Sequence, residues 1–276
     1  MEDAGRAALK RTIFFLSDHT GLTAEAIGRS LLSQFQGIDY DVVHRSFLHS
    51  MEKIEKVVQE IDHIASESGS RPIIFSTLVD PAFRKRLKAC NGLVIDYFET
   101  FTGVLEDELQ TASCHKYGQV HSMTNANAYH DRIDAVNFAL TNDDGTIVRN
   151  YPAADLILLG VSRSGKTPTC LYMALQYSIL AANYPLTEDD LESRSLPESL
   201  QPFQEKLYGL TIDAYQLQRI RQERRATGRY ATLEQCQWEI SAAEKLYKRH
   251  RIPYIDTTTM SVEEIATKIL AKTRRI

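Results

Sequence analysis

The feature that most constrains this chain is the loop sequence GVSRSGKT at Gly160–Thr167. It matches G-x-x-x-x-G-K-[ST] at every fixed position, it follows the apolar run Asp155–Gly160 (DLILLG), and it leads into a helix-like segment, Lys166–Leu180. Strand, loop and helix in this order can hold phosphate, because glycines let backbone N–H groups approach the anion and the helix presents its positive N-terminus. The predicted nucleotide-binding residues are Gly160, Val161, Ser162, Arg163, Ser164, Gly165, Lys166 and Thr167.

Three side chains of this loop predict separate contacts. We expect Lys166 to reach the terminal phosphates of the nucleotide and to act in catalysis, and the Thr167 hydroxyl to be a ligand of Mg²⁺. Arg163 is unusual in such a loop, and its guanidinium either binds a second phosphate or phosphoryl group or points into solvent. The alternative for the whole motif is a surface turn that matches by chance, which the flanking strand and helix patterns disfavour.

Strand-like and helix-like segments alternate through the first half of the chain. Apolar, β-prone runs occupy residues 12–17, 72–77 and 93–98, and residues 41–47 are typical of a strand with mixed faces. Residues 52–66 carry an amphipathic helical stripe. This alternation is typical of βαβ units, which form a parallel sheet covered by helices. The same alternation resumes after residue 153, with further strands expected at 155–160, 181–184, 208–212 and 252–256.

These patterns predict an α/β protein of two domains. We expect an N-terminal flavodoxin-like parallel-sheet domain at residues 1–150 and a C-terminal P-loop-containing α/β domain at residues 151–276. The second would be the domain that binds nucleotide, because it contains the loop.

Composition argues against several partners. The formal net charge is −4, so the chain lacks the overall basic charge that non-specific nucleic-acid binding requires. No apolar run approaches the length of a membrane span, and residues 1–11 lack the features of a signal peptide. We therefore expect a cytoplasmic protein with neither nucleic acid nor membrane as a partner.

Four acidic residues are candidates for a catalytic base or a metal ligand: Asp18, Asp131, Asp134 and Asp256. Asp18 and Asp256 each follow a predicted strand, at the sheet edge where ligands of α/β proteins bind, although aspartate is also common there as a turn or capping residue. Asp131 and Asp134 lie on the polar side of a predicted helix, where a solvated face is the alternative. The pattern does not choose among the four.

A basic stretch follows in the second half: Arg219, Arg221, Arg224, Arg225 and Arg229. It indicates either contact with a phosphoprotein or nucleotide, or a solvated helix face.

Several motifs together carry a family resemblance that runs nearly end to end. They are Ser17-Asp18-His19-Thr20-Gly21, Thr23-Ala24-Glu25, Arg132-Ile133-Asp134-Ala135, Asp143-Asp144-Gly145, Gly160–Thr169, Ala182–Leu186, Gly209–Asp213 and Ser261–Ala266. With them the chain resembles the bifunctional regulatory proteins of phosphoenolpyruvate synthase and pyruvate, phosphate dikinase. The glycine at position 165 resembles the loop of the synthase branch, since the dikinase branch commonly has serine at this position.

The resemblance implies two activities. One is ADP-dependent phosphorylation of a threonine in phosphoenolpyruvate synthase, which inactivates the target and releases AMP. The other is phosphate-dependent dephosphorylation of that residue, which releases pyrophosphate. ADP and inorganic phosphate would be the co-substrates, Mg²⁺ is expected, and the family implies a homodimer. The residues alone leave two other functions open: a P-loop small-metabolite kinase or ATPase, and a non-enzymatic regulatory module that senses nucleotide.

Overall fold

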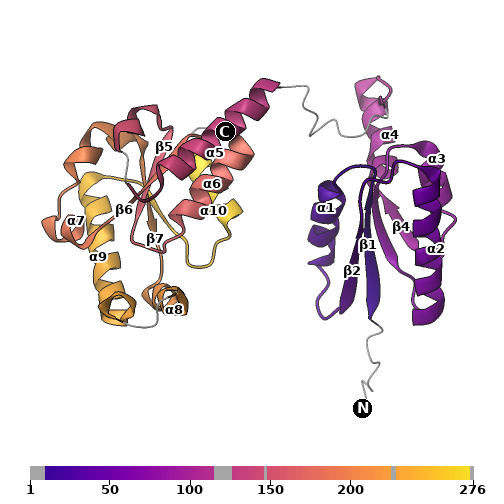
Figure 1. Cartoon of the computed structure of the whole chain (residues 1–276), viewed down its shortest axis with the longest axis horizontal. Coiled ribbons are helices and arrows are strands. Elements are labelled where there is room, and N and C mark those ends of the chain that lie inside the picture. The colour runs from indigo at the N-terminus through magenta and orange to yellow at the C-terminus, as the bar shows by residue number, and fades with distance from the viewer. Residues whose placement is uncertain (1–9, 115–125, 146–147, 225–227, 274–276) are drawn as a thin grey trace, which may run out of the picture. The chain divides into compact units, whose positions relative to one another are not determined.

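The computed structural model describes residues 10–114, 126–145, 148–224 and 228–273. The chain divides into two compact units, Met1–Ser122 and Met123–Ile276. Each unit contains a four-stranded parallel sheet with helices packed on both faces (Figure 1). The predicted α/β class is therefore confirmed.

The first unit alternates strands and helices as predicted up to its fourth strand, which ends at Asp96 because an additional helix begins at Tyr97. Its strands are β1 (Arg11–Ser17), β2 (Tyr40–Arg45), β3 (Ile73–Thr77) and β4 (Leu93–Asp96). Its helices are α1 (Leu22–Leu32), α2 (Met51–Ser68), α3 (Pro81–Leu87) and α4 (Tyr97–Leu109). The strand order is β2-β1-β3-β4, and each neighbouring pair is parallel. This is the order of the first four strands of a flavodoxin-like sheet.

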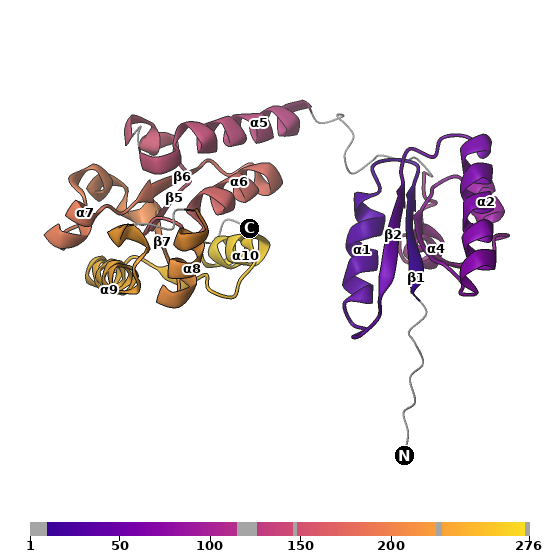
Figure 2. The same cartoon turned by 60° about the horizontal axis from the view of Figure 1, so that its bottom comes forward.

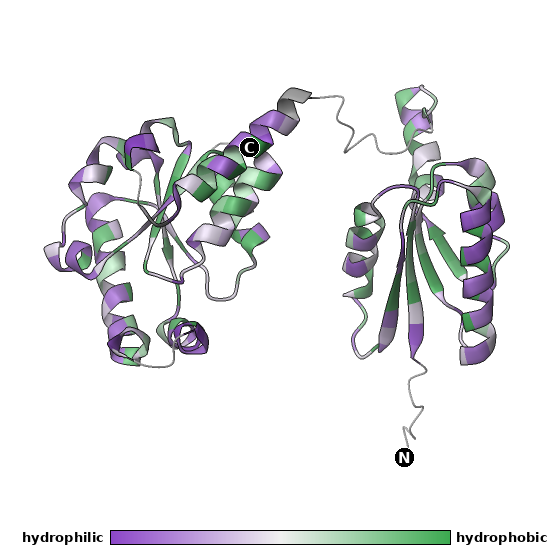
Figure 3. Ribbon diagram, viewed as in Figure 1, coloured by the Kyte–Doolittle hydropathy of each residue, from purple (hydrophilic) through white to green (hydrophobic). Residues whose placement is uncertain are grey.

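Alternation along β1 builds the two cores of this unit. Phe14 and Leu16 pack with α2 on one face of the sheet, while Ile13 and Phe15 pack on the opposite face. Because both faces are covered, β1 is hydrophobic along most of its length, whereas the edge strand β2 mixes hydrophobic and hydrophilic residues (Figure 3). The hydrophilic residues of α2 lie on its outer side.

The second unit repeats this architecture. Its strands are β5 (Leu156–Gly160), β6 (Ala181–Pro185), β7 (Leu207–Thr211) and β8 (Tyr254–Asp256). Its helices are α5 (Ala126–Thr141), α6 (Lys166–Tyr177), α7 (Glu188–Ser193), α8 (Ala214–Arg224), α9 (Leu233–His250) and α10 (Val262–Lys272). Short 3₁₀ helices are η2 (Asp143–Gly145), η3 (Val148–Ala153), η4 (Glu198–Lys206) and η5 (Arg229–Ala231). The strand order, β6-β5-β7-β8, is again parallel throughout.

Helices cover both faces of the second sheet. Helices α5, α6 and α10 share one core with the sheet, and α8 and α9 share the other (Figure 2). Ala135 and Ala139 of α5 are buried in the core that α6 lines, so α5 belongs to this unit. The predicted boundary near residue 150 therefore lies inside the second unit, because the division comes before α5.

The β5–α6 loop lies where the strand order of the second sheet reverses. β5 pairs with β6 on one side and with β7 on the other. The loop leaves the carboxyl end of β5, at the kind of switch point where open α/β sheets bind ligands. The fold thus places Gly160–Thr167 where the sequence analysis expects a phosphate site.

Candidate phosphate-binding site

Two glycines allow the loop between β5 and α6 to adopt its shape. A Cβ atom on Gly160 would lie 2.5 Å from Ser164 Oγ and 3.0 Å from the carbonyl oxygen of Leu210, so the backbone comes too close for any side chain. Gly165 has φ +94°, a left-handed conformation that favours glycine, and it directly precedes the first residue of α6. Close contacts therefore require glycine at position 160, and the left-handed backbone favours glycine at position 165.

Lys166 places its charge inside the loop. Its side-chain Nζ donates hydrogen bonds to the carbonyl oxygens of Gly160 and Val161, both at 2.9 Å, and the residue is only 5% exposed. The ammonium group is thus held against the loop backbone at the N-terminus of α6, where the helix dipole also favours an anion. This is the arrangement expected for a lysine that contacts phosphate.

Arg163 has a strained backbone within the loop. Its φ is +77°, a left-handed conformation that is uncommon outside glycine. Its guanidinium makes no hydrogen bond or ion pair with any residue that the structure describes. The side chain is therefore available to a ligand, and the choice between a phosphate contact and a solvent position stays a prediction.

Thr167 belongs to a polar cluster that the sequence analysis did not identify. The Thr167 hydroxyl donates to Asp143 Oδ1 at 2.8 Å. Asn183 Nδ2 donates to the same carboxylate oxygen and also to Thr167 Oγ1, at 3.2 Å from the latter. Asp143 lies in η2 and Asn183 in β6, so three separate segments meet beside the loop.

Asp143 supplies a carboxylate next to the phosphate-loop hydroxyl. Oxygen donors of this kind are the ligands that Mg²⁺ takes in nucleotide sites. The pattern at residues 141–145 (TNDDG) is typical of a turn and does not by itself indicate a metal ligand. The one feature of the sequence that could have identified Asp143 is the motif Asp143-Asp144-Gly145, which also carries the family resemblance.

The four predicted acidic candidates lie in different surroundings. Asp256 is exposed at the end of β8, where its Oδ1 accepts hydrogen bonds from the backbone N–H and the hydroxyl of Thr258. Its neighbour Thr257 donates to the carbonyl of Ser164 at 3.2 Å, which ties the β8–α10 connection to the phosphate loop. Asp256 thus lies near the loop and forms a turn.

Asp131 and Asp134 are exposed on α5, and their carboxylates make no hydrogen bond or ion pair within the described part of the chain. Asp18 lies in the first unit, is 5% exposed, and accepts a hydrogen bond from the Val79 backbone N–H at 2.7 Å. Burial raises the pKa of Asp18 above its ordinary value. A role for any of these three, or for Asp256, as base or metal ligand stays a prediction.

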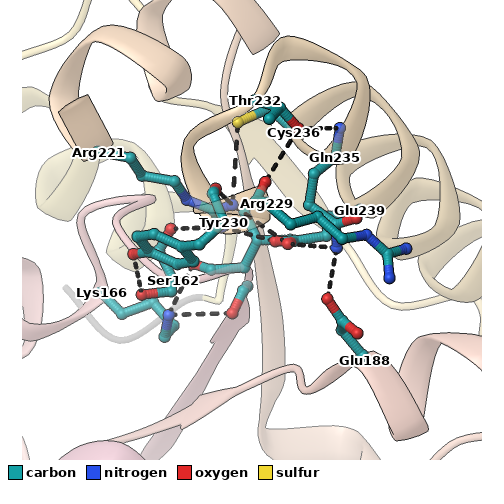
Figure 4. A network of polar contacts seen from close by, with 12 residues as sticks. Ser162, Lys166, Glu188, Arg221, Arg229, Tyr230, Thr232, Gln235, Cys236 and Glu239 are labelled. Carbon is teal, nitrogen blue, oxygen red and sulfur yellow. Dashed lines mark hydrogen bonds and ion pairs between the residues drawn. The ribbon is translucent and has the colours of Figure 1, made fainter. Parts of the chain in front are cut away.

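The basic stretch divides between the surface and the interior. Arg219, Arg224 and Arg229 are exposed, Arg225 lies outside the described residues, and Arg221 is fully buried. Arg221 pairs with Glu239 of α9 at 2.6 Å and donates to the carbonyl of Ser162 at 3.1 Å (Figure 4). One member of the stretch therefore contacts the phosphate loop.

No helix within the described ranges is both long and apolar enough to cross a membrane.

Comparison with known proteins identifies the family. A model of the kinase/pyrophosphorylase family matches residues 13–270. A protein of Legionella pneumophila (strain Corby) is 50% identical over 263 residues, which cover 95% of this chain and 97% of that protein. A protein of Marinobacter nauticus is 51% identical over 265 residues, which cover 96% and 98%. Both relatives are named as phosphoenolpyruvate synthase regulatory proteins. The chain belongs to the kinase/pyrophosphorylase family.

Proposed function

We propose that this protein transfers the β-phosphoryl group of ADP to a threonine of phosphoenolpyruvate synthase and releases AMP. In the opposing reaction, inorganic phosphate removes that phosphoryl group and leaves as pyrophosphate. Family membership and the names of the relatives support the enzyme class and the target. The intact Gly165 supports the synthase rather than the dikinase, on the resemblance described above.

The observation that carries the proposal is the position of the Lys166 ammonium group, which is hydrogen-bonded to the backbone of an intact phosphate loop. A cradle that holds two linked phosphates fits ADP in one direction and pyrophosphate in the other. One site can therefore serve both reactions, and the phosphate compound that occupies it selects between them. Phosphoryl transfer depends mainly on positioning and charge neutralisation, which a loop of this kind supplies.

In the forward step, the threonine oxygen attacks the β-phosphorus of ADP. The bond from that phosphorus to the bridging oxygen breaks, AMP departs with the electron pair, and the threonine proton passes to a base. In the opposing step, an oxygen of inorganic phosphate attacks the phosphorus of phosphothreonine. The bond from that phosphorus to the threonine oxygen breaks, and the threonine oxygen keeps the electron pair and takes up a proton. Lys166 neutralises the terminal phosphate in both directions, and Arg163 binds the group being transferred.

The oxygen donors beside the loop fit Mg²⁺. Thr167 and Asp143 would hold the ion, and Asn183, which donates to Asp143, orients that carboxylate. When bound, the ion supplies neutralisation of the phosphate charge.

The test is the intact mass of the synthase. The protein is incubated with purified synthase and ADP, and separately with phosphorylated synthase and inorganic phosphate. We expect a gain of one phosphoryl group with AMP formation in the first case, and its loss with pyrophosphate formation in the second. Lys166→Ala serves as the control for loop-dependent turnover and should abolish both. An unchanged synthase mass in both incubations contradicts the proposal.

The same assay separates the other two functions. A small-metabolite kinase or ATPase would turn over ATP without the synthase. A nucleotide-sensing module would bind ADP and inhibit the synthase while its mass stays unchanged.

A further inference from the structure

Ser162, the third residue of the phosphate loop, is held from two sides. Arg221 Nη2 donates to its carbonyl oxygen at 3.1 Å, and its hydroxyl lies 2.9 Å from the hydroxyl of Tyr230 (Figure 4). Arg221 comes from α8 and Tyr230 from η5, so both contacts reach the loop from segments far along the chain. The guanidinium also lies over the Tyr230 ring, 4.1 Å from its centroid, which joins the two side chains to each other.

Burial of Arg221 has no evident benefit for packing alone. Its side chain is 0% exposed, and its Nε has no hydrogen-bond partner among the described residues. A buried ion pair is seldom more stabilising than apolar side chains of the same volume. Unlike an apolar residue, Arg221 can donate hydrogen bonds. It donates to the Glu239 carboxylate and to the carbonyl oxygens of Ser162 and Tyr230.

Holding the Ser162 carbonyl also sets the next amide. The Ser162–Arg163 peptide is trans, so its C=O and N–H point in opposite directions. The carbonyl is taken by Arg221, while the N–H of Arg163 donates to none of the described residues. The left-handed backbone of Arg163 adjoins this amide, and such turns gather N–H groups around anions.

We propose that Arg221 and Tyr230 are positioning residues that orient the Arg163 amide toward the phosphates of the bound nucleotide. They act through Ser162 and do not touch the substrate. The arrangement is anchored by α9 and α7, because Gln235 donates both to Glu239, at 3.0 Å, and to Glu188, at 2.7 Å. The inference rests on the proposed function for the identity of the nucleotide.

Tyr230→Phe tests the hydroxyl contact, because it keeps the ring beneath the guanidinium. Tyr208→Phe is the matched control, since the Tyr208 hydroxyl is buried without a partner among the described residues. We expect Tyr230→Phe to weaken ADP binding, measured by calorimetry, about 2- to 10-fold. The KM for ADP and the KM for phosphate should rise together with little change in kcat. The thermal midpoint of Tyr230→Phe should stay within a few degrees of wild type, because the variant loses one partly buried hydrogen bond, and Tyr208→Phe should not lower it.

Arg221→Lys is the second variant. Lysine keeps the charge opposite Glu239 but lacks the planar fork that reaches Ser162 and Glu239 together, so we expect at least about a tenfold loss of ADP affinity. ADP affinity within about twofold of wild type in both variants would overturn the inference. Because ADP binding is measured without the synthase, a wild type that binds ADP and leaves the synthase unmodified contradicts the proposed function alone.

Discussion

Removal of Glu239 should leave a buried charge without its counterion. Arg221 is fully buried, and the Glu239 side chain is only 9% exposed. Burial alone would lower the pKa of the Arg221 guanidinium, but the hydrogen bonds and the charge of Glu239 raise it, so the group stays ionised. In Glu239→Leu the guanidinium keeps its charge and loses both carboxylate contacts.

The structure sets the size of this effect. Breaking a buried ion pair by removal of one partner typically costs about 3–5 kcal/mol of unfolding free energy. The double variant Arg221→Met/Glu239→Leu replaces the pair by apolar side chains and loses the donors to two backbone carbonyls, at about 1–3 kcal/mol for each carbonyl left buried. Absence of the buried charges offsets about 1–4 kcal/mol of that loss. The double variant should therefore be more stable than the single variant.

Trp238 makes the measurement local. It is the only tryptophan of the chain and lies in α9 next to Glu239, so its fluorescence reports unfolding of the second unit. With a urea dependence of about 2 kcal/mol per molar, the midpoint of Glu239→Leu should fall by about 1.5–2.5 M. The double variant should recover part of this shift without recovering ADP affinity. A double variant no more stable than Glu239→Leu, or one that binds ADP like the wild type, would refute the reasoning.

Three further changes test other parts of the molecule. Asp143→Asn should raise the Mg²⁺ concentration that gives half-maximal turnover by about 10- to 100-fold. ADP binding measured without magnesium should change little. Gly160→Ala should destabilise the second unit by about 1–3 kcal/mol in urea and impair ADP binding, because its Cβ would meet Ser164 and Leu210. Burial raises the pKa of Asp18, so the folded chain binds that proton more tightly and loses stability as pH rises from the ordinary value of 3.8 through the raised pKa. Asp18→Asn keeps an acceptor for Val79 and should lack this decline. The urea midpoint of the variant relative to that of the wild type should therefore increase from acid to neutral pH. If the two midpoints change with pH in parallel, the raised pKa of Asp18 is contradicted.

The sheets and the loop were predictable because their signals are local. The strands β1, β3, β5 and β7 are short, mostly buried runs rich in apolar residues, since central parallel strands are covered on both faces. The phosphate loop has its own local reasons for glycine, which are close contacts at Gly160 and a left-handed backbone at Gly165. The sequence analysis assigned no element to most of α4, whose apolar residues Phe101, Val104 and Leu109 are exposed and mark no buried face.

The parts of the site that were missed depend on contacts between distant segments. Asp143 reaches Thr167 across 24 residues, and only the packing of η2 beside β6 brings them together. The burial of Arg221 could have been predicted from spacing, because it lies four residues after Leu217 and shares its buried face of α8. Its ion pair with Glu239 of another helix and its hydrogen bond to the loop depend on tertiary packing, which helical spacing does not predict.

The two units share one strand order, so each has a switch point after its first strand. In both, a left-handed glycine, Gly21 or Gly165, precedes the helix that follows. The chemistry at the two points differs: the first places the buried carboxylate of Asp18 there, and the second the buried ammonium of Lys166. A carboxylate repels phosphate, and burial already disfavours its charge, whereas an ammonium held by carbonyl oxygens attracts it. The topology therefore offers two equivalent positions, and the charge that each buries favours the second for the proposed nucleotide phosphates.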